Sequence, residues 1–254
     1  MKGKVYLVGS GPGGTAFLTQ RGRAVIDKAD VVLFDQLPGE EILATLPEKA
    51  EKIDCGKYGG KHTLEQEEIE ALMLDRASKG RLVVRLKGGD PFIFGRGGEE
   101  LETIRAAGIQ VKMVPGISSA LAVPASVGIP LTHRTYASQV TILTGNEDPT
   151  KPGPALDWEL LAKSRGTIVI LMGVANLKKI ADALLRNGKA ATTPVAIIER
   201  GLRKDSRVTT APLEGIAAAA EKAGVKPPAV IVIGDVVSLY DQAQPDLIPL
   251  EDTL

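Results

Sequence analysis

Two glycine-rich stretches hold the residues best suited to bind a ligand. The first runs from Val8 to Gly14 as VGSGPGG and fits G-x-G-x-x-G at Gly9, Gly11 and Gly14. Asp35 ends the next strand-like run 21 residues later, where dinucleotide-binding folds place the acid that binds a ribose. Taken alone, these residues predict a nicotinamide or flavin enzyme, such as an NAD(P)-dependent oxidoreductase, with a plain tight turn as the alternative.

Two details of this loop oppose a dinucleotide site. Pro12 has no N–H to donate to a phosphate, and its φ angle is fixed. The following helix also begins late, because residues 15–18 intervene and Thr19 is the better N-cap for a helix over 20–28. A pyrophosphate needs the helix N-terminus at the glycine turn. The loop therefore suits close approach of the backbone to a flat or bulky ligand.

The second stretch, residues 83–100, is more informative. It reads VVRLKGGDPFIFGRGGEE and places five glycines within eleven positions after a predicted strand. Each glycine costs backbone entropy on folding, and ligands of open α/β sheets bind at the carboxyl ends of strands. A mobile surface loop would not need Phe92, Ile93 and Phe94 among the glycines. We therefore expect a second ligand-binding loop here.

Alternating strands and helices must position these loops. Short apolar, β-branched runs predict strands at 4–8, 31–34, 81–86, 110–114, 139–143, 167–172, 195–199 and 229–233. Helical patterns predict helices over 118–127, 177–186 and 213–223. A capping box at Thr63–Gln66 predicts a further helix with Ile69, Leu72, Met73 and Ala77 on one face. The alternation indicates an α/β fold with largely parallel strands.

Proline and glycine divide the chain at residues 115–130, and 254 residues suffice for two modest domains. We predict an N-terminal α/β domain over 1–120 and a C-terminal α/β domain over 121–242. An acidic tail follows over 243–254, and a polar loop is predicted over 146–156.

Charge and composition exclude several classes of protein. Lys+Arg and Asp+Glu both number 31, and there are nine aromatic residues, which argues against an extended nucleic-acid surface. No apolar run approaches the roughly 20 residues of a membrane span, and Met1 leads almost directly into a strand, without a secretory signal. Cys55, His62 and His133 make a poor metal cluster. We expect a cytoplasmic protein with no metal, nucleic-acid or membrane partner.

The order of seven sequence blocks resembles the tetrapyrrole methylase family over about residues 3–240. These blocks are VGSGPGG at 8–14, VVLFDQL at 31–37, GKYGG at 56–60, LKGGDPFIFGRGGEE at 86–100, VPGISSA at 114–120, GIPLTHR at 128–134 and LMGV at 171–174. Within the family, FGRGGEE and PLTHR point to members that methylate uroporphyrinogen III. The sequence resembles their single-function form, without a fused dehydrogenase–chelatase or synthase module.

The resemblance implies two α/β domains with S-adenosyl-L-methionine (SAM) in a cleft between them, usually in a homodimer and without a metal. The implied reaction methylates carbons 2 and 7 of uroporphyrinogen III, a small-molecule tetrapyrrole, and yields precorrin-2 and S-adenosyl-L-homocysteine. Precorrin-2 would serve sirohaem or cobalamin biosynthesis. Carried over residue by residue, the implied SAM contacts are Pro12, Gly88, Gly89, Asp90, Ile93, Ser118, Ser119, Met172, Gly201 and Ala229.

The same resemblance assigns two catalytic residues. Asp35 would be the general base that removes a proton from the macrocycle, with a helix-capping or ribose-binding acid as the alternative. Lys57 would be the proton donor, with a substrate-carboxylate contact or a solvated lysine as the alternatives.

Substrate contacts are expected from cations set in loops, because uroporphyrinogen carries eight carboxylates. Arg96 and Arg134 can each bind a carboxylate through a guanidinium fork, although a structural ion pair is an alternative for Arg134. Glu99 would accept pyrrole N–H groups or orient Arg96. For Arg85 and Lys87, closer to the strand, a structural pair is the expectation.

Three further functions compete with this interpretation. An oxidoreductase would use Gly9, Gly11, Gly14 and Asp35 and nothing downstream, and another tetrapyrrole methylase would share the opening loop. A non-catalytic tetrapyrrole carrier would keep the arginines but would not need two glycine loops. We also expect His133 to be a hydrogen-bonded packing residue and Cys55 to be inert core.

Overall fold

The computed structural model describes residues 2–58, 61–62, 64–147 and 156–242, with the backbone alone at 57–58 and 61–62. The chain divides into two compact units, Met1–Ser119 and Ala120–Leu254. The predicted acidic tail and residues 148–155 of the predicted polar loop lie outside the described residues.

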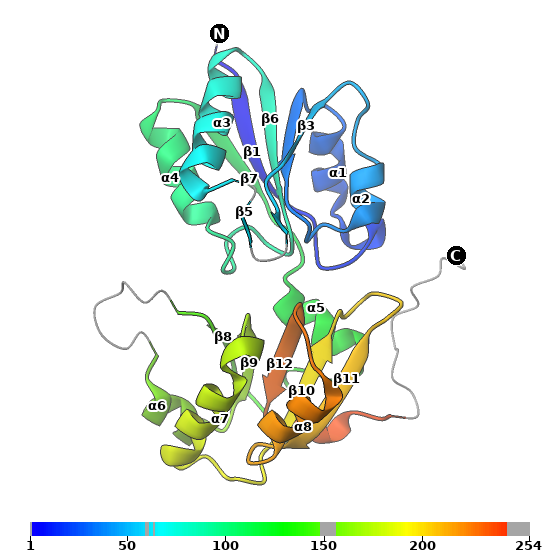
Figure 1. Ribbon diagram of the computed structural model, residues 1–254, viewed down its shortest axis with the longest axis vertical. Helices are drawn as coiled ribbons and strands as arrows, with labels where there is room; N and C mark the ends of the chain where they lie inside the picture. Colours follow the sequence, from blue (N-terminus) through cyan, green and yellow to red (C-terminus); the bar gives the residue numbers. More distant parts are fainter. Residues whose placement is uncertain (1, 59–60, 63, 148–155, 243–254) are drawn as a thin grey trace. The chain divides into compact units, whose positions relative to one another are not determined.

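The first unit is built on a parallel sheet with the strand order β3-β2-β6-β1-β7 (Figure 1). Its strands are β1 (Lys4–Gly9), β2 (Val31–Phe34), β3 (Glu51–Asp54), β6 (Leu82–Lys87) and β7 (Gln110–Val114). Every pairing between neighbours is parallel, as the sequence predicts. A short antiparallel pair, β4 (Lys57–Tyr58) and β5 (Lys61–His62), precedes α3 in the chain.

Helices cover both faces of this sheet. Figure 1 shows α1 (Gln20–Ile26) and α2 (Glu40–Ala44) on one side and α3 (Gln66–Ser78) and α4 (Gly97–Ala106) on the other. Alternate residues of each strand therefore enter two separate cores. Val83 packs with α3 and α4, whereas Val84 packs with α1 and α2. A strand buried on both faces reads as a continuous apolar run, which is why these strands are visible in the sequence.

The start of α1 confirms the predicted N-cap. The Thr19 hydroxyl accepts a hydrogen bond of 3.0 Å from the Gly22 N–H, and a short 3₁₀ turn, η1 (Thr15–Phe17), fills the interval after the glycines.

The predicted capping box of α3 is wrong by two residues. Glu65 rather than Thr63 is the N-cap, and its N–H donates to the Glu68 carboxylate at 2.7 Å. With the cap at Glu65, the preceding Leu64 packs against the same core as Ile69, the arrangement of a hydrophobic staple.

The second unit is built on a mixed sheet with the strand order β11-β10-β12-β9-β8. Its strands are β8 (Val140–Thr144), β9 (Thr167–Leu171), β10 (Pro194–Glu199), β11 (Arg207–Pro212) and β12 (Ala229–Ile233). Only β8 and β9 pair in parallel, and β12 is antiparallel to both neighbours. The prediction of largely parallel strands is wrong for this unit. Residues 200–206 join β10 to β11 as an antiparallel hairpin, a connection shorter than parallel strands need.

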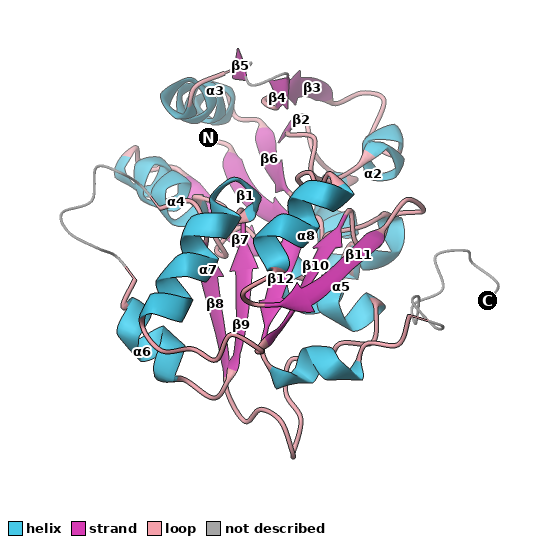
Figure 2. Cartoon of the chain, turned by 60° about the horizontal axis from the view of Figure 1, so that its bottom comes forward, coloured by secondary structure: helices cyan, strands magenta, loops and turns pink. Residues whose placement is uncertain are grey.

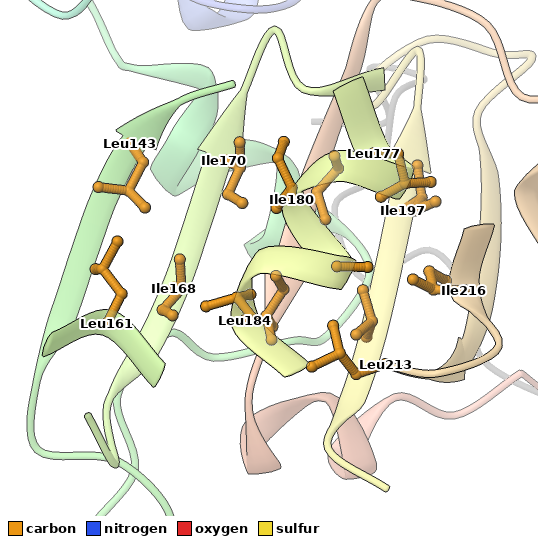
Figure 3. Packing of buried hydrophobic residues seen from close by; sticks show 14 of the residues in the cluster. Leu143, Leu161, Ile168, Ile170, Leu177, Ile180, Leu184, Ile197, Leu213 and Ile216 are labelled. Atoms are coloured by element: carbon orange, nitrogen blue, oxygen red, sulfur yellow. The ribbon is translucent and has the colours of Figure 1, made fainter. Parts of the chain in front are cut away.

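Helices α6 (Trp158–Lys163), α7 (Leu177–Arg186) and α8 (Ile216–Ala223) close the main core of this unit. Figure 2 shows α7 and α8 over one face of the sheet. In α7, Leu177, Ile180 and Leu184 form one apolar stripe that meets Ile168 and Ile170 of β9 (Figure 3). The unit also contains η2 (Val174–Asn176) and η3 (Asp235–Leu239), and α5 (Ser119–Ser126) begins at the last residue of the first unit.

Each sheet has an edge at which the strands' carboxyl ends gather, here called its carboxyl edge. In the first unit it is formed by the ends of all the parallel strands. In the second unit the ends of β8, β9 and β10 share it with the start of β12, because Glu199 pairs with Ala229 and Leu171 with Val230. Among the described residues, no helix is long and apolar enough to span a bilayer, and no group of three or more His, Cys, Asp or Glu is arranged to hold a metal ion.

Candidate active site

The two glycine loops meet directly at the carboxyl edge of the first unit. Gly11 N–H donates to the Gly89 carbonyl at 3.2 Å, and Gly89 N–H donates to the Gly11 carbonyl at 2.9 Å. The turn after β7 joins them, since a Cβ placed on Gly116 would lie 2.1 Å from the Gly89 oxygen. Only glycine permits this approach. These three loops, with the first residue of α5, contain the candidate cofactor residues of the first unit: Pro12, Gly88, Gly89, Asp90, Ile93, Ser118 and Ser119.

The carboxylate of Asp90 fastens the loops to one another. It accepts the Phe92 N–H at 2.8 Å within its own loop and the Gly116 N–H at 3.1 Å in the turn after β7. Gly89 beside it has a φ of +63°, a region that L-residues avoid. These contacts fix the shape of the edge that the candidate ligand must fit.

An acidic side chain lies against the end of the first glycine loop. Glu41 of α2 accepts the backbone N–H of Thr15 at 3.2 Å and also the Thr15 hydroxyl. The donor next to the first glycine loop is thus occupied by a carboxylate, which would repel a phosphate. Helix α1 begins only at Gln20, so its N-terminus does not open at the glycine turn.

Apolar side chains are unusually exposed around the same edge. Leu37, Phe92, Ile93, Phe94 and Ile117, which follow β2, β6 and β7, are 40–52% exposed. Large apolar groups gathered on a surface mark a binding site rather than ordinary solvent-facing residues. Together with the glycine loops, they favour a ligand with a broad apolar face.

Backbone strain also gathers at the carboxyl edges. Among the described residues, the non-glycine residues with positive φ are Phe94, Arg96, Met172, Arg200 and Leu202. They lie in the loops after β6, β9 and β10. Such conformations persist where the surrounding structure enforces them and are enriched at functional sites. Met172 is a candidate residue, and Arg200 and Leu202 flank another, Gly201.

The remaining candidate cofactor residues share the carboxyl edge of the second unit. Met172 follows β9, Gly201 follows β10, and Ala229 begins β12 between those two strands. Gly201 lies tightly against α5, because a Cβ there would be 2.4 Å from Val123 Cγ1. Backbones also approach closely after β8, where a Cβ on Gly145 would lie 2.3 Å from the Gly173 Cα.

Asp35 lies at the carboxyl end of β2 and is held from two sides. Its Oδ1 accepts the Leu37 N–H at 2.9 Å, and its Oδ2 is 3.6 Å from the Arg85 guanidinium. The side chain keeps about a quarter of its surface exposed, so a substrate can reach it. For Lys57 the structure describes only the backbone, in β4.

Behind Asp35, a cluster of buried charges confirms the expected structural pairing of Arg85 and Lys87. Lys87 Nζ lies 2.8 Å and Arg85 Nε 3.3 Å from the same Oε1 of Glu100, which is fully buried. Burial lowers the pKa of Lys87, and the nearby Arg85 charge lowers it further, while Glu100 opposes both effects. Sequence reasoning missed Glu100, whose position in a helix resembles that of a surface acid.

Arg96 and Glu99 form an ion pair at the start of α4. Arg96 Nε donates to Glu99 Oε2 at 2.9 Å, and both side chains are more than half exposed. Hydrogen bonding to Glu99 raises the pKa of Arg96, so the guanidinium stays charged. Glu99 was expected either to accept pyrrole N–H groups or to orient Arg96. In the structure its carboxylate contacts Arg96.

Arg134 does not join the candidate cofactor residues of its unit. It is exposed and lines a pocket of about 250 Å³ with Arg165, beside Gln139 and Gly166, which precede β8 and β9. This is the amino end of β9, and β9 has five residues, so Met172 lies roughly 16 Å away along the strand.

His133 and Cys55 are placed as expected. His133 Nδ1 accepts the Thr135 N–H at 3.2 Å, and the ring centroid lies 5.0 Å from that of Tyr136. Cys55 packs in the core beneath α3 and α4, where burial raises the pKa of its thiol to about 11.

Comparison with known proteins decides the family. Residues 4–217 match the family described as Tetrapyrrole (Corrin/Porphyrin) Methylases. The chain belongs to this family. It is 57% identical, over 94% of both chains, to an S-adenosyl-L-methionine-dependent uroporphyrinogen III methyltransferase of Methanosarcina barkeri. It is also 46% identical to the uroporphyrinogen-III C-methyltransferase of Methanocaldococcus jannaschii, over 95% of this chain and 99% of that one.

Solved structures agree with the assignment of this chain to the tetrapyrrole methylases. The uroporphyrin-III C-methyl transferase of Thermus thermophilus, complexed with S-adenyl homocysteine, has a TM-score of 0.80 and 40% identity over 94% of this chain and 100% of that chain. A cobalt precorrin-4 methyltransferase has a TM-score of 0.81 at 28% identity, over 92% and 95% of the two chains. The methylase spans about half of the siroheme synthases it matches, such as that of Serratia proteamaculans. These matches give no support to the oxidoreductase alternative.

Proposed function

We propose that this methylase transfers methyl groups from SAM to carbons 2 and 7 of uroporphyrinogen III, giving precorrin-2 and S-adenosyl-L-homocysteine. The main support is its 57% identity, over nearly the whole of both chains, to a uroporphyrinogen III methyltransferase. A homodimer, a cytoplasmic location and a supply of precorrin-2 to sirohaem or cobalamin biosynthesis belong to the same proposal and rest on family resemblance.

The residues at the carboxyl edges suit SAM better than a dinucleotide. SAM carries a sulfonium cation and no phosphate, and the first unit presents the carboxylates of Glu41, Asp90 and Asp35 around its loops. Exposed Ile93 and Met172 offer apolar contact to an adenosyl group. The proposed SAM contacts are those predicted from the sequence: backbone groups of the three joined loops in the first unit, and Met172, Gly201 and Ala229 in the second.

Methyl transfer requires the protein to align the methyl donor with the pyrrole carbon and to remove a proton. Bound SAM supplies an electrophilic methyl group, whose C–S bond breaks as a bond to the pyrrole carbon forms, with the electron pair passing to sulfur. The rigid glycine loops would hold this geometry, and the apolar side chains around them would exclude water. Asp35 would then accept the proton whose loss returns the methylated macrocycle to neutrality. Lys57 would donate a proton to one atom of the macrocycle as a second proton leaves another atom, which completes a tautomeric change without altering the net charge.

Substrate recognition would combine apolar and cationic groups. Phe92 and Phe94 are exposed beside Arg96 on one loop, so the macrocycle and a carboxylate arm would be bound together. Arg96 is oriented by Glu99 and would share its fork with that arm. Arg134 stays a predicted contact for another carboxylate arm, and its pocket lies at the amino end of β9 rather than at the carboxyl edge.

Calorimetry would test the cofactor assignment. We expect saturable binding of S-adenosyl-L-homocysteine and none of NADH. An assay with uroporphyrinogen III and SAM should then yield a doubly methylated product. Tight NADH binding without a response to the homocysteine nucleoside would overturn the proposal.

Two variants separate substrate binding from chemistry. Arg96→Ala should remove one charge-assisted contact of about 1.5–3 kcal/mol, a loss of roughly 10- to 150-fold in apparent uroporphyrinogen affinity, with SAM affinity nearly unchanged. Asp35→Asn should lower kcat more than affinity, because an amide cannot take the proton. If Arg96→Ala weakens SAM and spares uroporphyrinogen, the assignment of this loop is wrong.

A further inference from the structure

The buried charges of the first unit lie on one face of its sheet. Arg85 and Lys87 alternate with Leu86 along β6, so they point to the side covered by α3 and α4, as Val83 does. Asp35 continues the alternation of Val31 and Leu33 on β2 and lies on the same side. Glu100 enters from α4. Four charged groups thus meet at the carboxyl end of two neighbouring strands.

Arg85 is buried and is held by polar contacts at each of its guanidinium nitrogens. Its side chain is 5% exposed. Its Nε donates to Glu100, and its Nη1 donates to the Leu86 carbonyl at 3.2 Å. The remaining nitrogen, Nη2, is the one directed at Asp35, at 3.6 Å. The guanidinium therefore connects the buried Glu100 carboxylate to the partly exposed carboxylate of Asp35.

Glu100 provides that fixed anion. It is fully buried, and its Oε1 accepts from Lys87, Arg85 and the Gln66 amide at 2.8, 3.3 and 3.3 Å. A buried carboxylate persists only where such partners compensate its lost hydration. Lys87 lies 2.8 Å from the same oxygen, so the carboxylate is held from a second side while Nη2 of Arg85 stays directed at Asp35.

We propose that Arg85 is the positioning residue of Asp35, and that Glu100 holds Arg85 in place for this purpose. The inference rests on the proposed function, in which Asp35 accepts the proton. The other contact that holds the Asp35 side chain is the Leu37 N–H, which donates to Oδ1, so loss of the guanidinium would free the carboxylate to rotate. A displacement of a catalytic group by about 1 Å costs up to about 100-fold in rate.

A double-mutant cycle tests the proposal. Arg85→Lys keeps the charge but cannot reach Glu100 and Asp35 together, because an ammonium lacks the fork. We expect kcat to fall about 10- to 100-fold, with the KM for SAM and the affinity for S-adenosyl-L-homocysteine unchanged. In the Asp35→Asn background the same substitution should have almost no further effect on kcat.

Two other variants complete the experiment. Glu100→Gln leaves the residues Arg85 and Asp35 unchanged but removes the charged acceptor that holds the guanidinium. It should therefore reproduce part of the kcat loss, again only while Asp35 is present. Arg76→Lys is the matched control, because Arg76 pairs with Glu51 at the amino end of β3, in the same unit but at the opposite edge. Its kcat should match that of the parent.

The outcomes separate two failures. If Asp35→Asn retains full kcat, the assignment of Asp35 as proton acceptor fails. If Asp35→Asn is impaired while Arg85→Lys multiplies its effect, the positioning role alone is overturned. Loss of S-adenosyl-L-homocysteine binding in both Arg85→Lys and Glu100→Gln would also overturn it, because the cluster would then maintain the fold rather than the base.

Discussion

The carboxyl edges of the two units use the same chemical group in different ways. Each holds a fully buried glutamate among cations: Glu100 in the first unit and Glu199 in the second. The two cations that pair with Glu100 are themselves buried, whereas Arg207, the main partner of Glu199, is 48% exposed.

This difference separates a chemical role from a structural one. Glu199 on β10 and Arg207 on β11 are paired residues of one hairpin, and the Lys226 N–H also donates to Glu199 at 2.9 Å. That cluster also reaches Arg200, which lies 4.0 Å from Glu199 and pairs with Asp205 at 2.6 Å in the loop between the two strands. In the first unit, the chain of contacts continues through Arg85 to Asp35, a group that a substrate can reach.

The largest expected effect comes from breaking the loop junction of the first unit. Gly116→Ala would place a Cβ 2.1 Å from the Gly89 oxygen and 2.7 Å from the Gly9 Cα. Because backbone must move to relieve this overlap, we expect a loss of about 3 kcal/mol in unfolding free energy and loss of S-adenosyl-L-homocysteine binding. Denaturant unfolding and calorimetry would measure both. Gly98→Ala, where a Cβ meets nothing within 4 Å, is the control and should leave both intact.

Breaking the cluster of the second unit should cost stability but not catalysis. Glu199→Gln leaves Arg207 without its charged acceptor, and we expect about 2 kcal/mol of lost stability with kcat changed less than about twofold. Glu100→Gln should instead lower kcat. Unfolding curves and steady-state kinetics on the two variants would check the contrast. A large kcat loss in Glu199→Gln would remove the distinction between the clusters.

The same glutamate predicts how stability depends on pH. Burial raises the pKa of Glu199, but the hydrogen bonds from Arg207 and the Lys226 N–H outweigh it and bring the pKa below its ordinary value of 4.5. Its contribution is therefore complete above about pH 4.5 and is lost as pH falls through the lowered pKa. The hydrogen bond from Arg76 also lowers the pKa of Glu51. This carboxylate therefore adds to the loss of stability at low pH. As the pH is lowered from 6 to 3, the Tm should fall less steeply in Glu199→Gln than in the parent.

The smallest effects compare one helix cap in each unit. Thr19 caps α1 through the Gly22 N–H, and Asp157 caps α6 through the Leu160 N–H at 2.9 Å. Alanine at either position should cost about 1 kcal/mol. Thr19→Ala should also weaken S-adenosyl-L-homocysteine binding slightly, because α1 follows the first glycine loop, whereas Asp157→Ala should not. Equal calorimetric affinities for both variants would show that α1 does not support that loop.

What the sequence predicted well depends on neighbouring residues. The Thr19 cap, the delay before α1 and the bounds of β12 follow from capping chemistry and apolar runs. The antiparallel pairing of β10 was missed, because pairing direction depends on segments far apart in the chain. Glu100 was missed for a similar reason. Its burial arises only when α4 packs on β6, although two cations alternating in the apolar strand β6 were a signal that a buried anion must face them.

Most of the candidate cofactor loops were predictable because glycine spacing records a backbone requirement. The structure adds what spacing cannot record: Glu41 covering the Thr15 N–H and Asp90 linking two loops through backbone amides. Both contacts join segments that are more than twenty residues apart.

The buried thiol of Cys55 makes the chain a convenient host for chemical labelling. Cys55 is the single cysteine of the sequence, and with a pKa of about 11 only about one thiol in 10⁴ is ionised at neutral pH. Maleimides react with the thiolate and need access to it, so the parent protein should remain unmodified. A cysteine introduced at exposed Leu160 in one unit and another at exposed Phe92 in the other would then take a fluorophore pair without background. Energy transfer between them would follow the distance between the units as S-adenosyl-L-homocysteine is added.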